Sequence, residues 1–186
     1  MGDSFLAQKL PGFTNPTHEA PECHQPFVLT VGGHPWSLAA DGAWVFAVRG
    51  TSSFAQGEAR ELFTKLLSAV PKAPVEVSTA KLKAWVGQVP SVRVFGEEGR
   101  HEGAIFGHLF DLRRLACLLE PIPFPKLALW DATKVVGVRC LGMESKGKWR
   151  GFLAALDGDP EVEHRVFDFR PEGAEAFDMM GSLTQD

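Results

Sequence analysis

The sequence predicts an α+β fold in which an antiparallel sheet carries helices on one face, built as two similar helix-plus-strand halves. Three observations predict it. Strand-like segments flank Asp41-Gly42, a dipeptide typical of tight hairpin turns. The apolar period then becomes helical over 59–70. Finally, residues 37–50 and 127–140 align without a gap, which suggests that one strand–turn–strand unit occurs twice.

The first 50 residues predict a helix, a loop and three strands. Pro11 ends a short helical pattern, and four prolines between residues 11 and 26 indicate a loop. The stretch FVLTV is rich in β-branched residues, and two more strand patterns flank the Asp41-Gly42 turn, where positive φ is tolerated. The predicted elements are a helix over 4–10 and strands over 27–31, 36–40 and 43–49.

The middle of the chain alternates between helical and strand patterns. Six apolar residues from Ala59 to Val70 recur three and four positions apart, which predicts a helix that Pro71 ends. After the short VEV strand, Ser78 or Thr79 can cap a second helix. A GEEG turn then joins two strand patterns in a hairpin. The predicted elements are helices over 59–70 and 80–86 and strands over 75–77, 92–95 and 100–106.

The last part predicts one helix followed by strands. A broad apolar face from Ile105 to Leu119 indicates a helix, which the stretch PIPFP ends. Strand patterns follow, two of them separated by the basic loop ESKGK. The predicted elements are a helix over 107–119 and strands over 127–130, 134–141, 149–156 and 161–168.

The composition is that of a globular protein. Of 186 residues, 45% are hydrophobic and 23% are charged, which is enough to bury a core. No apolar stretch reaches the roughly 18 residues that cross a membrane, and the N-terminus lacks the pattern of a secretory signal. Three cysteines do not make a disulfide framework. We therefore expect a cytoplasmic protein with no membrane partner.

Charge divides the chain into a mildly basic body and an acidic end. Residues 157–186 contain nine acids and two bases, whereas the preceding residues have an excess of bases. We expect three parts: a short helix and Pro-rich loop at 1–26, an α+β domain at 27–169 and an acidic tail at 170–186. Such asymmetry fits a polyanion-binding body with an acidic tail, and it also fits an acidic segment that keeps a protein soluble.

The order of four sequence stretches resembles that of a known family. "FLAQKL", "FVLTV", "WSLAADG" and "WVFAVRG" follow the helix, the strand, the strand ending in T/A-D-G and the xxxAxxR strand of bacterial-type DNA sliding clamps. In the second half, "IFGHLFDLRRLACLLEP" is similar to a clamp's strand-into-helix stretch, and "FPKLALWDATKVVGVRC" and "KGKWRGFLAAL" resemble its closing strands. The resemblance covers about residues 4–156, with an additional helix near 58–70 that the clamp pattern does not contain.

The resemblance implies a protein of DNA replication that binds rather than catalyses. A clamp-like domain has two helix-plus-strand halves and holds double-stranded DNA by attraction between a basic, helix-lined surface and the phosphates. It also implies self-association through unpaired edge strands, or a protein partner that covers an edge. Several acids on the same predicted helices would weaken the positive field. The candidate DNA-binding residues are Lys65, Lys81, Lys83, Arg113, Arg114, Lys146, Lys148 and Arg150, with Lys72 as a further basic residue.

A second interpretation is an adaptor or regulatory subunit that binds another protein through an apolar groove, without DNA. The chain contains five tryptophans and fourteen phenylalanines. Exposed tryptophans would form a protein-binding patch. The candidates are Trp36, Trp44, Trp130 and Trp149. A uniformly positive helix face favours DNA, and a mixed face with an apolar groove favours a protein.

Enzyme and metal motifs are weak in this sequence. Residues 78–81, STAK, match the S-x-x-K of serine β-lactamases, but the accompanying S-D-N and K-T-G are missing, so Ser78 is expected to be a helix cap. The spacing of His18, Cys23, His24 and His34 fits no standard zinc pattern. There is no Gly-rich phosphate loop. We predict no catalytic residue, no metal and no cofactor.

The acidic tail leads to one further expectation. Residues 171–186 carry four acids and no base, together with Phe177, Met179 and Met180. If the tail competes with DNA for the basic residues, truncation before Pro171 tightens duplex binding, most strongly at low salt. Alternatively, its apolar residues hold it in an apolar groove.

Overall fold

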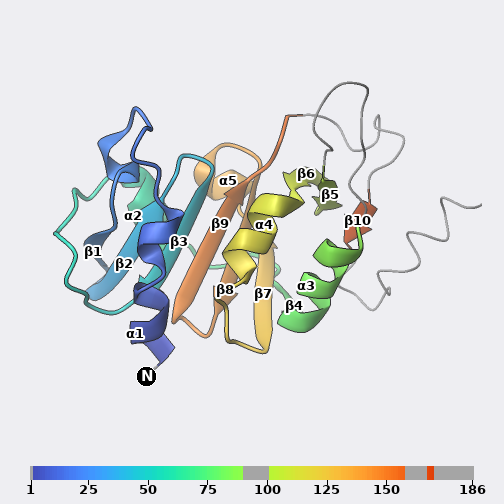
Figure 1. The fold of residues 1–186 in the computed structure, drawn as a ribbon, viewed down its shortest axis with the longest axis horizontal. Helices are drawn as coiled ribbons and strands as arrows, with labels where there is room; N and C mark the ends of the chain where they lie inside the picture. Colours follow the sequence, from blue (N-terminus) through green and yellow to red (C-terminus); the bar gives the residue numbers. More distant parts are fainter. Residues whose placement is uncertain (1, 90–100, 158–166, 170–186) are drawn as a thin grey trace, which may run out of the picture.

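The computed structural model describes residues 2–89, 101–157 and 167–169 (Figure 1). Its helices are α1 (Gly2–Ala7), α2 (Glu61–Ser68), α3 (Thr79–Gln88), α4 (Leu112–Leu119) and α5 (Thr133–Val136), with 3₁₀ turns η1 (Leu10–Phe13) and η2 (Pro21–Cys23). Its strands are β1 (Phe27–Val31), β2 (His34–Ala40), β3 (Trp44–Arg49), β4 (Val75–Ser78), β5 (Glu102–Ile105), β6 (His108–Asp111), β7 (Lys126–Asp131), β8 (Cys140–Ser145), β9 (Trp149–Ala154) and β10 (Phe167–Phe169).

Seven strands form one large antiparallel sheet, in the order β1-β2-β3-β9-β8-β7-β4. The order shows two similar halves. In one, α1 precedes the consecutive strands β1, β2 and β3, and in the other α4 precedes β7, β8 and β9. The halves meet where their last strands, β3 and β9, pair antiparallel. The predicted α+β class, the antiparallel sheet and the two helix-plus-strand halves are therefore confirmed.

The sheet separates two apolar cores because successive strand residues point to opposite faces. On β2 and β3, Ala39, Phe46 and Val48 belong to one core, whereas Leu38 and Val45 belong to the other. The first core includes apolar side chains of α1, α3 and α4. The second includes Phe63, Leu66 and Leu67 of α2.

Helices consequently cover both faces of the sheet, which corrects one part of the prediction. Helices α1, α3 and α4 share one face, as expected, and α4 crosses in front of the central strands in Figure 1. Helix α2 lies on the opposite face together with α5, behind the sheet in that view. Helix α2 is the additional helix that the clamp pattern does not contain. An amphipathic helix has to bury its apolar side, and α2 buries it in the second core.

Two predicted elements differ from the structure in type. The helix expected over 107–119 begins only at Leu112, because residues 108–111 form β6, which pairs with β5. The strand expected over 134–141 is divided between the short helix α5, which Gly137 ends in a left-handed conformation, and β8, which begins at Cys140. The predicted strands over 92–95 and most of 161–168, and the acidic tail, lie outside the described residues.

The gapless alignment of 37–50 with 127–140 does not identify equivalent hairpins. It matches β2 with β7, although β2 corresponds to β8 by its place in the sheet. What the alignment does detect is a local role shared by two aspartates. Asp41 follows β2 and Asp131 is the last residue of β7, and each accepts a backbone N–H from the residue two positions on.

Candidate nucleic-acid interface

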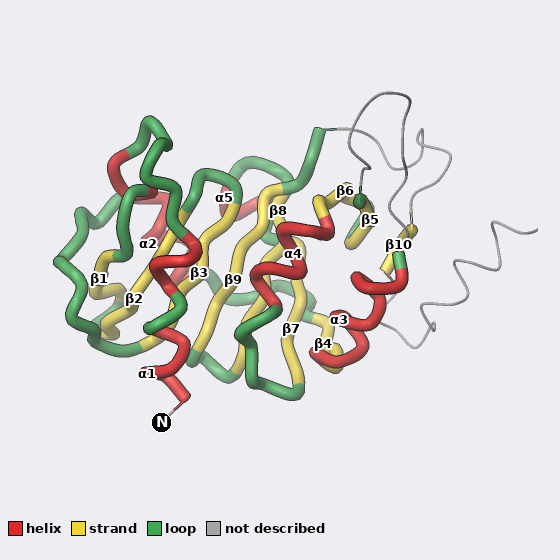
Figure 2. The backbone as a smooth tube through the Cα atoms, viewed as in Figure 1, coloured by secondary structure: helices red, strands yellow, loops and turns green. Residues whose placement is uncertain are grey.

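Helices α3 and α4 lie against each other on one face of the sheet and form its most basic helical surface (Figure 2). Lys81, Lys83 and Arg113 are exposed, and Arg114 is partly exposed. Neither helix contains an acid between its first and last residue. The acids are Asp111 and Glu120, directly before and after α4. The Lys83 Nζ atom lies 3.4 Å from the Ile122 carbonyl oxygen, just beyond α4, so Lys83 lies near the C-terminal end of that helix, whereas Arg113 and Arg114 are near its N-terminal end.

Lys81, Arg113 and Arg114 lie in the first turns of their helices, and Lys83 lies at the start of the second turn of α3. Helix α3 begins after Ser78, whose Oγ accepts the Lys81 backbone N–H at 3.3 Å, which confirms the expected cap. Helix α4 begins after Asp111, whose Oδ1 accepts the Arg113 N–H at 2.9 Å. The N-terminal end of a helix carries partial positive charge, and these basic side chains add to it. The start of α3 therefore has a positive charge, whereas at the start of α4 the Asp111 carboxylate, 3.9 Å from Arg114 Nε, offsets part of it.

Arg114 is partly engaged within the protein. Its Nη1 lies 2.9 Å from Asp41 Oδ2, and its guanidinium lies 5.2 Å from the centre of the Trp44 ring. The side chain keeps 42% of its surface exposed. Arg114 thus ties α4 of the second half to the β2–β3 turn of the first, and it can offer only part of its guanidinium to a ligand.

The other four predicted residues are not on this surface. Lys65 belongs to α2 on the opposite face and pairs with Glu61 at 2.8 Å. Lys146 and Lys148 are exposed in the β8–β9 turn, at an end of the sheet. Arg150 is only 8% exposed. The structure therefore places Lys81 and Lys83 on α3 and Arg113 and Arg114 on α4, two contacting helices on one face of the sheet. Lys65, Lys146, Lys148 and Arg150 lie elsewhere.

Arg150 holds α2 on the sheet. Its Nη2 lies 2.9 Å from Glu144 Oε2, and its Nη1 donates to the Leu66 carbonyl oxygen at 2.8 Å. Its guanidinium also faces the Trp130 ring, with 5.7 Å to the centre. A buried guanidinium is tolerated only when it is paired in this way. This placement leaves Arg150 no surface for a phosphate.

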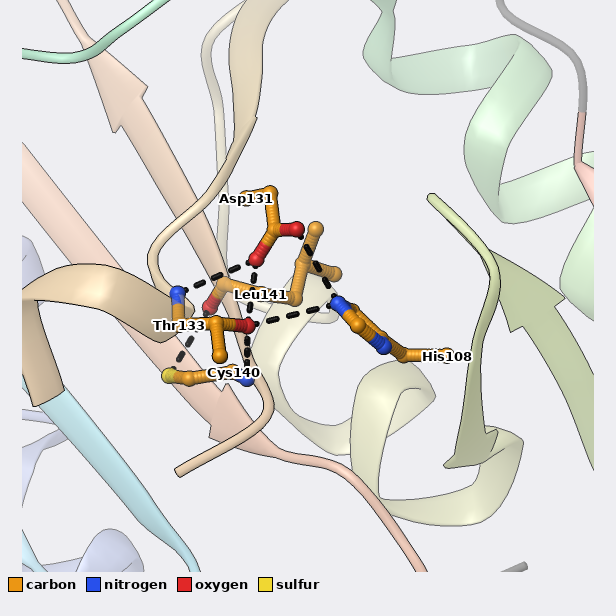
Figure 3. A network of polar contacts seen from close by, with 5 residues as sticks. All are labelled: His108, Asp131, Thr133, Cys140 and Leu141. Carbon is orange, nitrogen blue, oxygen red and sulfur yellow. Dashed lines mark hydrogen bonds and ion pairs between the residues drawn. The ribbon is translucent and has the colours of Figure 1, made fainter. Parts of the chain in front are cut away.

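A polar network at the junction of β6, β7, α5 and β8 is the cluster that most resembles a catalytic arrangement (Figure 3). His108 Nε2 lies 3.0 Å from Asp131 Oδ2 and 3.3 Å from Thr133 Oγ1. In a nucleophile–histidine–acid triad the two partners contact different ring nitrogens, but here both contact Nε2. The Thr133 hydroxyl donates to Asp131 and accepts the Cys140 N–H at 3.2 Å. The network fixes the start of α5 and is not arranged as a triad.

Ionisation in this network follows from its hydrogen bonds. Burial acts to raise the pKa of Asp131, but hydrogen bonds from Thr133 and His108 outweigh it and hold that pKa below its usual value. Burial raises the pKa of the Cys140 thiol to about 12, so it stays protonated at neutral pH. Burial also raises the pKa of Cys23.

An apolar cavity of about 280 Å³ lies on the α2 face, and no motif in the sequence predicts it. Side chains from the 18–23 loop, α2, α5 and the central strands line it. Two large apolar side chains at this cavity are unusually exposed, Leu62 at 43% and Val138 at 55%. The cavity brings together segments far apart in the chain, so no local pattern could have found it.

The tryptophans do not form the exposed patch that was considered. Trp36, Trp130 and Trp149 are buried, with exposed fractions of 5%, 1% and 0%. Trp44 is partly buried beneath Arg114 and donates its Nε1–H to the Phe13 carbonyl oxygen. Bulky rings fill the two cores, and aliphatic side chains make the apolar surface on the α2 face.

Within residues 2–89, 101–157 and 167–169, no three His, Cys, Asp or Glu side chains are placed to hold a metal ion. None of the helices in these ranges is long and apolar enough to cross a membrane.

Comparisons with known proteins identify the fold. No family model and no curated protein sequence match the chain. Among solved structures it is similar to the DNA polymerase III subunit beta from Pseudomonas aeruginosa (TM-score 0.57, 8% identity, 85% of this chain and 66% of that one). It is similar to the DNA polymerase sliding clamp from Bacillus subtilis (0.58, 6%, 84% and 62%) and to the DNA polymerase III beta chain from Streptococcus pneumoniae TIGR4 (0.52, 8%, 84% and 63%). The chain spans less than two thirds of their length, and it has a clamp-like fold.

Proposed function

We propose that this chain is a non-enzymatic, clamp-like protein that binds double-stranded DNA along the surface of α3 and α4. One observation carries the proposal: in a fold similar to that of DNA polymerase sliding clamps, these two helices contain four bases and no acid. The helix on the opposite face, α2, carries one acid and one base that neutralise each other. This difference between the two faces supports an orientation in which α3 and α4 face the DNA.

Phosphates, and not bases, are the groups that this surface can recognise. Lys81 and Lys83 end in mobile ammonium groups that attract phosphate as point charges. No described feature of α3 or α4 is built to read base edges, which usually takes several side chains inserted in a groove. Binding is therefore sequence-independent and weak, with a dissociation constant of about 10⁻⁴ to 10⁻⁶ M at physiological salt.

The double variant Lys81→Ala/Lys83→Ala is expected to weaken binding to a duplex and to reduce its salt dependence. Each phosphate contact contributes about 0.9 to the slope of log K against log salt, so the slope falls by about 2. Lys65→Ala is the matched control, because Lys65 is exposed but lies on the opposite face, and it should leave the slope unchanged. Fluorescence anisotropy with a labelled duplex measures both. Equal effects of the two variants would show that DNA does not bind at α3 and α4.

The proposal also includes a biological process, DNA replication, and a mode of assembly through the edge of the sheet. The solved structures with this fold are beta subunits and clamps of DNA polymerases, which supports a role in DNA replication and a cytoplasmic location. Strand β4 ends the large sheet, and in the described part of the chain only β7 pairs with it. We propose that a second copy or another protein covers the outer edge of β4.

A second function is favoured by the cavity on the α2 face. Its apolar lining and the exposed Leu62 and Val138 would accept an aliphatic or aromatic side chain of a partner protein. The chain would then be an adaptor without DNA binding. If the wild-type protein does not bind a duplex at about 50 mM salt, where electrostatic binding is strongest, this function takes the place of the first.

A further inference from the structure

The outer edge of β1 is occupied by a segment of the same chain. Residues 55–57, here called the strap, run beside β1 and form a parallel bridge between Gln56 and Val28. The Val28 N–H donates to the Ala55 carbonyl oxygen, and the Gly57 N–H donates to the Val28 carbonyl oxygen, both at 2.9 Å. The strap therefore takes both backbone groups that Val28 directs away from the sheet.

These groups are the ones that an added strand would need. In an antiparallel pair, successive residues direct their backbone groups alternately toward the partner strand and away from it. Because Val28 directs its groups to the strap, its neighbours along β1 direct theirs toward β2. The hydrogen-bonded pairs between the two strands are therefore Phe27–Leu38, Leu29–Trp36 and Val31–His34. On the five residues of β1, the outward-facing positions are then Val28 and Thr30. With Val28 occupied, an incoming strand finds only one free position, which is too short a ladder for stable pairing.

Close packing fixes the strap in place. A Cβ atom at Gly57 would lie 2.3 Å from the Phe27 ring, so only glycine allows the strap to approach this closely. The Phe27 ring is buried and packs edge-on against Phe63 of α2, so moving it aside would disturb this contact. Beyond the strap, Arg60 pairs with Glu22 at 3.3 Å.

We propose that the strap closes one edge of the sheet and thereby limits self-association by strand pairing to pairs of molecules. A head-to-tail assembly needs two different edges, here β1 and β4, and can continue indefinitely unless it closes on itself. With β1 closed, the outer edge of β4 is the end of the large sheet that no strand among the described residues covers. When β4 pairs with β4 of a second copy, that edge is used on both molecules, and the large sheets then present only strapped edges at their outer ends. Assembly therefore stops at two copies. Covering an edge strand in this way prevents the continued edge-to-edge association that an exposed strand permits.

Gly57→Ala tests this inference without DNA, so its failure is distinguishable from failure of the proposed function. The added methyl group should lift the strap, and the Val28 amide should then exchange its hydrogen at least about tenfold faster. Light scattering at about 5 to 200 μM, a range where weak association shows, should give species larger than two copies for Gly57→Ala and never for the wild type. Gly87→Ala is the control, because a Cβ at Gly87 meets nothing within 4 Å.

Three results would overturn the inference. The first is wild-type protein that forms species larger than two copies. The second is a Gly57→Ala variant with fast exchange at Val28 but the mass distribution of the wild type. The third is unchanged exchange at Val28, which would show that the strap does not depend on the close approach of Gly57. If Gly57→Ala does not fold, Arg60→Ala loosens the strap more gently by removing the Glu22 ion pair, and the same two measurements apply.

Discussion

Glu144→Ala is expected to destabilise the protein by about 3 kcal/mol, the lower end of the cost of leaving a buried charge without its partner, because Arg150 is buried and Glu144 keeps 19% of its side chain exposed. Arg150 is 8% exposed and cannot turn to solvent, and its Nη2 would lose the Glu144 oxygen 2.9 Å away. Its remaining hydrogen bond, to the Leu66 carbonyl oxygen, attaches α2 to the sheet. Urea denaturation followed by circular dichroism measures the loss as a lower free energy of unfolding.

Two further variants distinguish the effect of burying an ion pair on stability from the effect of its charges. Glu76→Ala removes an exposed ion pair, with Lys126 at 3.2 Å, and should cost no more than about 1 kcal/mol. The double variant Glu144→Met/Arg150→Met replaces both buried charges with apolar groups and should recover most of the stability lost in Glu144→Ala. Equal losses for Glu144→Ala and Glu76→Ala would contradict the role assigned to Arg150.

Gly142→Ala has the second largest expected effect, a loss of about 2 kcal/mol from overpacking. Gly142 lies opposite Trp130 across β7 and β8, and a Cβ there would come within 2.3 Å of the Trp130 ring. The ring is 1% exposed and is held between Phe152, at 5.7 Å between ring centres, and the Arg150 guanidinium. Because neither neighbour can yield, the added methyl group has to displace the strand.

The control for Gly142 comes from a helix. Gly87→Ala adds the same methyl group to α3 in open space and should stabilise the protein by up to about 1 kcal/mol, the difference in helix propensity. In a Trp130→Leu background, Gly142→Ala should cost less than in the wild type, since the clash partner is smaller. A cost that does not depend on residue 130 would show that the close approach is not what requires glycine.

Local signals predicted most of the sheet. The sequence predicts β1 from the β-branched stretch FVLTV and predicts β2 and β3 from the apolar stretches on either side of the Asp41-Gly42 turn. These signals do not depend on the rest of the chain. The apolar residues from Ile105 to Phe110 fit a helical stripe and a buried strand equally well, so β6 was read as the start of α4. Asp111, which caps α4, was the signal that could have placed the boundary.

The candidate site was only partly predictable, because it depends on which face each element occupies. The bases of α3 and α4 could be listed from the sequence, but their common surface follows from the packing of the two helices. Arg150 looked like a loop residue because it follows the basic ESKGK stretch, yet it lies inside β9 and points under α2. The face that α2 covers is set by long-range packing, which periodicity does not report.

The central claim, that α3 and α4 bind the phosphates of duplex DNA, is tested most directly by a salt titration of the wild-type protein with a labelled duplex. Two to four phosphate contacts predict binding at about 50 mM salt and a slope of log K against log salt between about −2 and −4. The affinity should not depend on the duplex sequence. No binding at that salt concentration, or a slope near zero, would contradict the account.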